Sequence, residues 1–193
     1  DMILAVQDNP FDVTVRFGLE VDYVPGRMDE VFENLDAVAF DYLIGSIHYV
    51  EDFPFDNPDT RRQWEDPAKC EWTWSGYVDA LDGLVDCGAF DFIGHLDLPK
   101  KFGFRSNDPE RVMARFDAAL ALAGKKGMAI EINTGGLRKP VREMYPSLEL
   151  LKAAKSHDVP ITFGSDAHSP KQVGADFSAA AELARHVRGV GLL

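Results

Sequence analysis

The sequence has little cysteine, no long apolar run and a deficit of positive charge. Its two cysteines, Cys70 and Cys87, have no CxxC spacing, which favours reduced thiols and a cytoplasmic protein over a disulfide framework. No run of about 20 apolar residues is present, so no membrane span is predicted. The first residues lack the basic start of a signal peptide. Because 32 acidic residues outnumber 20 basic ones, the chain is poorly suited to sequence-independent nucleic-acid binding.

What is present is an alternation of strand-like and helix-like segments. The 193 residues are 46% apolar, which fits one domain over residues 1–193. Helical periodicity is found at residues 27–35, 75–87, 146–154 and 177–187, and in a segment that begins at Asp108-Pro109. Five strand-like runs lie between these segments, at residues 14–20, 40–48, 90–97, 128–133 and 160–168. This alternation predicts an α/β fold with a parallel sheet.

The number of strands and one long irregular stretch lead to two further expectations. Five strands, with residues 191–193 a weak sixth, are too few to close an eight-stranded barrel, so we expect an N-terminal part of the fold to lie outside this sequence. Residues 49–74 are rich in proline, aspartate and aromatics. A loop of this length is usually a lid or a binding loop, and we expect it to cover the substrate.

Side chains that bind metals or transfer protons lie at the ends of all five runs. In a barrel these ends share one pocket, whatever their separation in sequence. Each residue alone has a structural alternative, such as a capping carboxylate or a hydrogen-bonded core histidine. Together they predict a divalent-metal site, and the nitrogen and oxygen donors suit zinc, manganese and iron alike. The candidates are Glu20, His48, His95, Asp97, Glu131, Asp166 and His168.

Two basic segments are candidates for binding an anionic substrate. In the turn from Asn133 to Lys139, paired glycines can present backbone N–H groups and Arg138 can form a fork onto a phosphate. Lys100 and Lys101 place two cations beside the expected pocket. The alternative is a solvated turn and ordinary surface charge.

Six segments resemble the histidinol-phosphatases of the polymerase-and-histidinol-phosphatase (PHP) family, and the resemblance covers nearly the whole chain. The segments are GLEVDY (18–23), GSIHYV (45–50), FDNP (55–58), GHLDLPKKFG (94–103), EINTGGLRKP (131–140) and GSDAH (164–168).

The resemblance implies a distorted seven-stranded (βα)7 TIM-like barrel with up to three zinc, iron or manganese ions. In that scheme Glu20 bridges two ions, and His48 and His95 complete one site. Asp166 and His168 belong to the other two sites and are also catalytic candidates. Asp97 orients His95. The implied phosphate- or substrate-binding residues are Arg138, Ser46, Lys100, Lys101 and, in the 49–74 stretch, Asp56.

The sequence departs from the family pattern at its start. The HxH pair of the first strand and two further histidines before the GLE segment are absent. The resemblance therefore implies the C-terminal part of an enzyme that hydrolyses L-histidinol phosphate, with the missing N-terminal barrel segment as a partner. Two alternatives stay open: a PHP phosphoesterase acting on nucleotides, and a non-catalytic fragment or subunit of a split barrel.

Overall fold

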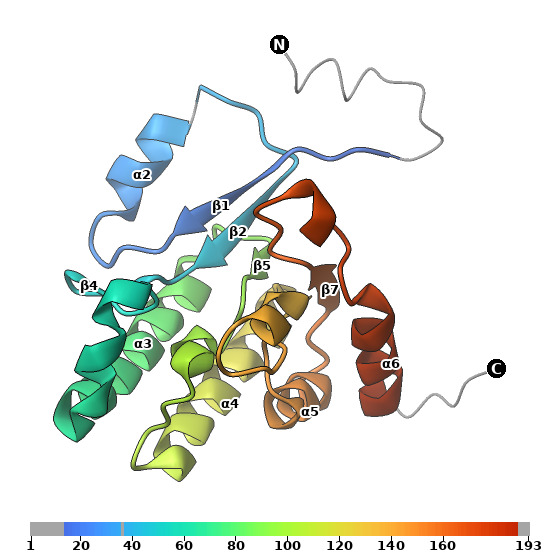
Figure 1. Cartoon of the computed structure of the whole chain (residues 1–193). Coiled ribbons are helices and arrows are strands. Elements are labelled where there is room, and N and C mark those ends of the chain that lie inside the picture. Colours follow the sequence, from blue (N-terminus) through green and yellow to red (C-terminus); the bar gives the residue numbers. More distant parts are fainter. Residues whose placement is uncertain (1–13, 36, 189–193) are drawn as a thin grey trace.

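The computed structural model describes residues 14–35 and 37–188, which build a parallel sheet covered by helices (Figure 1). All five strands of the sheet are parallel, and neighbours in the sheet also follow one another along the chain, apart from a separate β3–β4 hairpin. This singly wound order is that of a βα-barrel wall rather than a doubly wound sheet. The strands are β1 (Gly18–Asp22), β2 (Tyr42–Ser46), β5 (Phe92–Ile93), β6 (Ala129–Asn133) and β7 (Ile161–Gly164).

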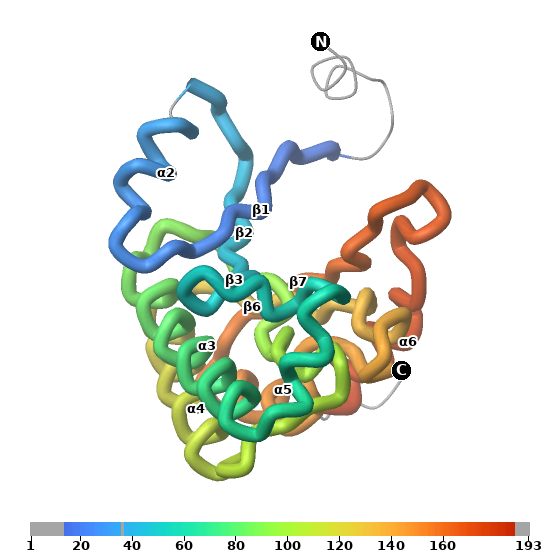
Figure 2. The backbone as a smooth tube through the Cα atoms, turned by 60° about the vertical axis from the view of Figure 1, so that its left-hand side comes forward, coloured from blue at the N-terminus to red at the C-terminus, as the bar shows by residue number. Residues whose placement is uncertain are grey.

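Four helices pack against one another in chain order and cover one face of the sheet (Figure 1). The helices are α3 (Pro67–Cys87), α4 (Pro109–Lys126), α5 (Leu148–Ser156) and α6 (Phe177–Arg188). The short helix α2 (Met28–Leu35) connects β1 to β2 and stands apart from this layer (Figure 2). Within residues 14–35 and 37–188, β1 and β7 are the outer strands and the barrel wall is not closed. The α/β prediction is confirmed.

Local signals explain most helix boundaries. Helix α4 begins as predicted, because the Asp108 side chain accepts a hydrogen bond from the Arg111 N–H at 3.0 Å, and it ends at Gly127, whose φ is +71°. The predicted start of α3 at Ser75 is wrong. The helix begins eight residues earlier, where Asp66 caps the Ala68 N–H and Pro67 occupies the first turn.

Alternation along the strands separates an apolar face from a polar one. Val21, Ile93 and Ile130 are buried beneath the helices, whereas Glu20 and Glu131 lie on the opposite face. Because parallel strands place their carboxyl ends at one edge, the polar side chains of that face gather there.

The expectation that residues 49–74 form a substrate lid is wrong for three of its aromatic residues. The segment folds into the hairpin β3 (Tyr49–Val50) and β4 (Phe53–Pro54), the 3-10 helix η1 (Pro58–Glu65) and the first turns of α3. Three of its rings, Phe55, Trp64 and Trp74, are buried in the core, and the Trp64 indole donates to the Phe55 carbonyl at 2.9 Å. Phe55 and Trp64 pack edge to face against each other, and Trp74 packs in the same way against Phe116 of α4, so all three rings contribute to the core.

Three other expectations concern the cysteines, membrane-spanning helices and a sixth strand. Cys70 and Cys87 form no disulfide. No helix among the described residues is both long and apolar enough to cross a bilayer. The weak sixth strand at residues 191–193 lies outside the described part of the chain.

Candidate metal centre

Three predicted ligands, Glu20, His48 and His95, meet at the carboxyl edge of the sheet. Glu20 is on β1, His48 follows β2, and His95 follows β5. One donor atom from each residue lies within 4.8 Å of the other two. Within the described ranges, this is the one group of three or more His, Cys, Asp or Glu side chains with such geometry. The structure thus brings together residues that are up to 75 positions apart in sequence.

The Glu20 carboxylate is the centre of this group. Its Oε1 atom lies 3.0 Å from the His95 Nε2 and 3.8 Å from the His48 Nε2. It also accepts a hydrogen bond of 2.6 Å from the Ser46 hydroxyl. Ser46 is buried, so the structure places it as a support for Glu20 rather than on an open phosphate-binding rim.

The electrostatics of the group favour a carboxylate that is always charged. Partial burial on its own would raise the pKa of Glu20. The hydrogen bond and charge of His95, together with the hydrogen bond from Ser46, have the larger effect and lower the pKa to about 2. For His48, burial favours the neutral ring and lowers the pKa. The hydrogen bond and charge of Asp22 have the larger effect, so the pKa of His48 is raised above 6.5. A permanently charged carboxylate between two imidazoles is a donor set suited to a borderline divalent cation.

Asp22 is a functional candidate that the sequence analysis did not single out. Its Oδ1 lies 2.6 Å from the His48 Nδ1, which leaves the His48 Nε2 directed at Glu20. A carboxylate on the far ring nitrogen is the usual partner of a metal-binding histidine, because it fixes the tautomer and the ring orientation. The signal was available: Asp22 lies two residues after Glu20 on a strand, and therefore on the same face.

His95 has a strained backbone that is held by a buried carboxylate. Its φ is +24°, a value that non-glycine residues rarely adopt, and its N–H donates to the Glu131 Oε2 at 3.1 Å. Glu131 is only 7% exposed, and burial raises its pKa. Glu131 is accommodated because Gly164 has no side chain: a Cβ there would lie 1.5 Å from the Glu131 Oε1.

The other ring nitrogen of His95, Nδ1, is not the atom that faces Glu20. His95 Nδ1 is buried and has no hydrogen-bond partner among the described residues. A buried, unpaired ring nitrogen costs free energy unless another group binds it. The donors that meet at Glu20, two imidazoles and one carboxylate, form a set that fits a bound divalent ion.

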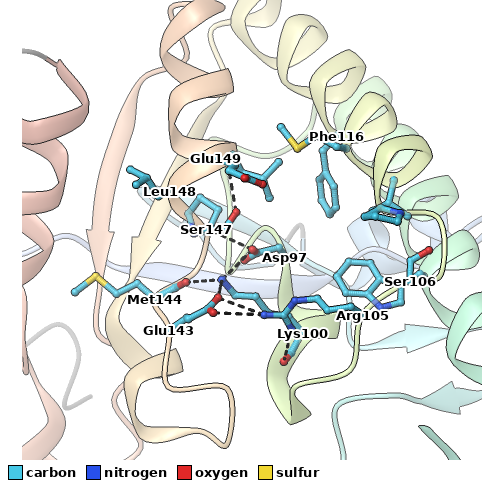
Figure 3. Close-up of a pocket in the computed structure, with 16 residues that line it drawn as sticks. Asp97, Lys100, Arg105, Ser106, Phe116, Glu143, Met144, Ser147, Leu148 and Glu149 are labelled. Atoms are coloured by element: carbon cyan, nitrogen blue, oxygen red, sulfur yellow. Dashed lines mark hydrogen bonds and ion pairs between the residues drawn. The ribbon is translucent and has the colours of Figure 1, made fainter. Parts of the chain in front are cut away.

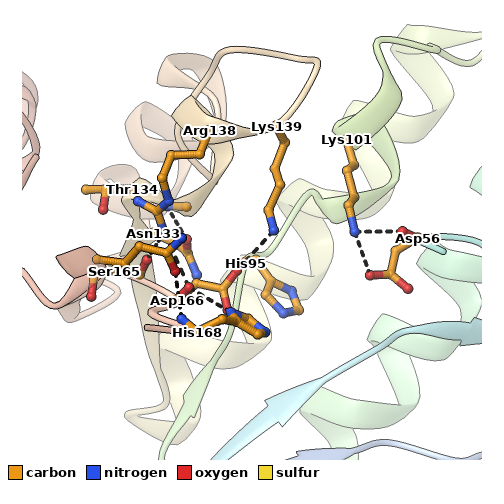
Figure 4. Close-up of polar contacts among 12 residues, drawn as sticks. Asp56, His95, Lys101, Asn133, Thr134, Arg138, Lys139, Ser165, Asp166 and His168 are labelled. Atoms are coloured by element: carbon orange, nitrogen blue, oxygen red, sulfur yellow. Dashed lines mark hydrogen bonds and ion pairs between the residues drawn. The ribbon is translucent and has the colours of Figure 1, made fainter. Parts of the chain in front are cut away.

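Asp166 and His168 form a second group at the tip of β7 (Figure 4). The His168 Nδ1 lies 3.5 Å from the Asp166 Oδ1, and the Lys139 Nζ lies 3.9 Å from the Asp166 Oδ2. Asp166, like His95, has a positive φ, at +47°. Neither residue belongs to the three-residue group of Glu20, His48 and His95.

Arg138 supports the β7 tip from the neighbouring turn (Figure 4). Its Nη2 donates to the carbonyls of Ser165 and Asp166. Its Nη1 is buried and has no partner in the part of the chain that the structure describes. One half of the guanidinium thus fixes the backbone next to Asp166, and the other half is left for a further acceptor.

Lys101 and Asp56, predicted separately, contact each other (Figure 4). The Lys101 ammonium donates to the Asp56 carboxylate at 2.9 Å and to its carbonyl at 2.6 Å. The Asp56 charge also contributes to the raised pKa of His48, after the larger effect of Asp22.

Lys100 lies in a different environment from Lys101. Its side chain is 2% exposed and lies 3.0 Å from the Asp97 Oδ2 and 3.1 Å from the Glu143 Oε2 (Figure 3). The expectation that Asp97 orients His95 is wrong. The Asp97 Oδ2 is bound by Lys100 and by the Ser147 N–H, and its Oδ1 has no partner among the described residues.

A parallel sheet wound in chain order, with nitrogen and oxygen donors at the carboxyl ends of its strands, defines a TIM-like α/β domain built to hold a metal. The chain belongs to the PHP domain family, whose model matches residues 3–135, and a model described as PHP-associated matches residues 149–185. The family membership predicted from the six motifs is confirmed.

Two relatives show how much of the family protein this chain covers. A protein of Deinococcus radiodurans named "Probable histidinol-phosphatase" is 41% identical over 177 residues, which are 92% of this chain and 65% of that protein. The histidinol-phosphatase of Bacillus subtilis is 26% identical in an alignment of 182 positions that covers 86% of this chain and 68% of that protein. The chain thus spans about two thirds of the length of these relatives.

The fold matches a solved structure of a named enzyme. Histidinol phosphate phosphatase from Lactococcus lactis, complexed with zinc, L-histidinol and phosphate, aligns with a TM-score of 0.77 at 23% identity. The alignment covers 96% of this chain and 72% of that one. At 23% identity, the structural similarity shows that the two proteins share a fold.

Proposed function

We propose that this chain supplies the metal-binding part of a phosphomonoester hydrolase that acts on L-histidinol phosphate. The observation that carries the proposal is the convergence of Glu20, His48 and His95 on one point at the carboxyl edge of the sheet. The names of the Deinococcus and Bacillus relatives support the substrate. Residues 1–193 belong to a single PHP-type domain in this proposal, and a cytoplasmic location stays a prediction.

The protein side chains divide the work of the reaction among them. A divalent zinc, iron or manganese ion held by Glu20, His48 and His95 supplies Lewis acidity for activating water and neutralising phosphate charge. Asp22 orients His48, and Ser46 and Glu131 hold Glu20 and the His95 backbone in place.

The β7 tip is assigned to the phosphate and the leaving group. Arg138 Nη1 has no described partner and is the nitrogen that we assign to a phosphate oxygen. Asp166 and His168 are assigned as ligands for further ions and as catalytic groups of the proposed reaction. Lys139, close to Asp166, adds a positive charge to this rim.

The paired side chains of Lys101 and Asp56 are assigned to the substrate on the opposite side. Lys101 adds positive charge for the phosphate, and Asp56 is suited to the substrate's ammonium group. Lys100 is left out of this assignment, because its ammonium is buried between two carboxylates.

The remaining ligands of a three-metal centre come from a segment outside this sequence. The chain contains no HxH pair, and it spans 65% of the Deinococcus relative. A segment with that pair, from the same or another polypeptide, would pair with β1, which is an outer strand among the described residues, and complete the wall.

The first experiment measures metal content and phosphate release together. We expect the purified 193-residue chain to hold about one divalent ion by mass spectrometry, and we expect His95→Ala to lose it. His157→Ala is the matched control, because His157 pairs only with Asp117 at the surface. Retention of metal by His95→Ala would refute the assigned centre.

The substrate is tested with the full product of the gene. Phosphate release is compared for L-histidinol phosphate and for nucleotide mono- and bisphosphates, and we expect the first to be preferred. Arg138→Ala should raise KM or lower kcat by about 100-fold or more if one half of the fork binds phosphate. Turnover of nucleotides alone would favour the other PHP activity, and metal binding without any turnover would favour a non-catalytic role.

A further inference from the structure

A cavity of about 600 Å³ lies in the helical layer, apart from the candidate metal centre (Figure 3). It is bounded by one turn of α3, the first turns of α4 and α5, and the loops that precede those two helices. None of Glu20, His48, His95, Asp166 or His168 lines it. The cavity therefore belongs to neither group of predicted metal ligands.

The walls of the cavity are mostly apolar. Trp74, Val112, Phe116 and Leu150 are buried side chains that line it, and Pro146 closes one side. A cavity of this size with mostly apolar walls is the usual form of a small-molecule site. The two aromatic rings favour a flat ligand.

Two polar atoms of the lining residues have no hydrogen-bond partner among the described residues. They are the Nε1 of Trp74 and the Oδ1 of Asp97, in residues that are 4% and 3% exposed. An indole N–H can only donate, and a carboxylate oxygen can only accept. Leaving both unpaired costs free energy, and a ligand that pairs with both recovers it.

Four of the five charged residues that line the cavity are paired with one another, and the fifth, Glu149, is exposed and has no ion pair among the described residues. Asp97 is paired with Lys100 at 3.0 Å, and Glu143 pairs with both Lys100 and Arg105 at 3.1 Å and 3.4 Å (Figure 3). A ligand with a full charge would disturb this balance in a mostly apolar space. The cavity therefore favours an uncharged ligand.

We propose that this cavity binds a flat, uncharged small molecule that has both an N–H donor and a hydrogen-bond acceptor. An aromatic carboxamide or a heterocycle of the nucleobase type has this chemistry. The ligand donates to the Asp97 Oδ1, accepts from the Trp74 indole, and packs its ring against Phe116 and Val112. The proposal does not depend on phosphatase activity.

The test is an NMR titration of the metal-free, ¹⁵N-labelled 193-residue chain with benzamide. The chain has three tryptophans and so three indole N–H signals, and Trp74→Phe identifies the one that belongs to Trp74. The Trp64 signal is an internal reference, because its N–H already donates to the Phe55 carbonyl. We expect saturable movement of the Trp74 signal downfield, with the Trp64 signal unmoved.

Matched probes and variants make the result decisive. Benzoate has the same ring but a negative charge and no N–H donor, and it should bind at least about tenfold more weakly. Trp74→Phe should weaken benzamide binding by about tenfold, followed through backbone signals of α4. Leu148→Trp, at a cavity residue that is 38% exposed, should block the cavity without disturbing the core.

Three results would overturn the proposal. They are no saturable shift up to about 10 mM benzamide, equal binding of benzoate, and unchanged binding in a Leu148→Trp protein that keeps the Trp64 reference signal. Because the readout is binding to the metal-free chain, failure here would leave the proposed metal centre untouched.

Discussion

The Nδ1 atom of His48 lies 2.6 Å from the Oδ1 atom of Asp22, and this contact fixes which nitrogen of His48 faces Glu20. Asp22 comes from the first strand of the sheet and His48 follows the second, so the contact joins two neighbouring strand ends. The contact matters because an imidazole must be in one tautomer to bind a metal. A carboxylate that accepts the N–H of the opposite ring nitrogen fixes that tautomer.

Asp22→Asn should therefore weaken metal binding by about 10- to 100-fold, while the fold stays intact. The amide keeps the size of the side chain but removes the charge that holds the His48 N–H. Zinc affinity can be measured by competition with a chromogenic chelator. Asp29→Asn, at an exposed position on α2, is the charge-matched control. Equal losses in both variants would mean that only net charge matters.

The same contact predicts how metal affinity depends on pH. The pKa of His48 is raised above 6.5, because the hydrogen bond and charge of Asp22 outweigh the opposing effect of burial. A proton and a cation compete for this ring, so the affinity of the chain for zinc should rise with pH through the raised pKa and then level off. In Asp22→Asn the rise should move to lower pH, toward 6.5.

The metal-free chain should show the complementary effect on stability. Protonated His48 contributes stability below pH 6.5, and that contribution is lost as pH rises through its higher folded-state pKa. Denaturant unfolding of the chain and of Asp22→Asn across this range gives the comparison. If the difference in unfolding free energy between the two proteins did not change with pH, the assigned contact would be contradicted.

That Glu20, His48 and His95 lie at one edge could be predicted from topology, whereas their grouping into one site, apart from Asp166 and His168, was implied by the family resemblance. Parallel strands in chain order place their carboxyl ends at one edge, so any polar residue just after a strand is a candidate. Asp22 could have been found by the same rule of alternation. Asp22 lies two residues beyond Glu20, the last residue of the strand-like run, and so falls outside the predicted strand end.

The environments of Lys100 and Lys101 could not be predicted in this way. Both lie in the 3-10 helix η2 (Leu98–Phe102), where successive side chains point about 120° apart. One ammonium therefore enters the protein and meets Asp97, and the next meets Asp56. The buried rings of Trp64 and Trp74 were mispredicted for a related reason: tertiary packing, not local pattern, decides whether an aromatic in an irregular stretch is core.

Gly164 provides a test of the support beneath His95. Alanine there would place a methyl group 1.5 Å from the present position of the Glu131 Oε1, so the buried carboxylate would have to move. Gly164→Ala should then lower the free energy of unfolding by about 2–4 kcal/mol and weaken zinc binding, because the His95 N–H loses its acceptor.

A double-mutant cycle with Glu131→Ala checks the cause. If the clash with Glu131 is responsible, Gly164→Ala should add little to the destabilisation already present in Glu131→Ala. Denaturant unfolding of the four proteins gives the interaction energy. If the destabilising effects of the two substitutions were fully additive, Gly164→Ala would act on a group other than Glu131.

Lys100 and Lys101 offer a last, closely matched pair of variants. Lys100→Met removes the counter-charge of Asp97 and leaves this carboxylate buried and without an ion pair. The variant should lose about 3–5 kcal/mol of stability. Lys101→Met removes an ammonium from the partly exposed Asp56 and should cost about 1 kcal/mol, while raising KM in the full enzyme. Adding Asp97→Asn to Lys100→Met should restore part of the loss, because no unpaired charge then remains. If both lysine variants instead lost the same stability and the same activity, the separation of a structural Lys100 from a substrate-facing Lys101 would be refuted.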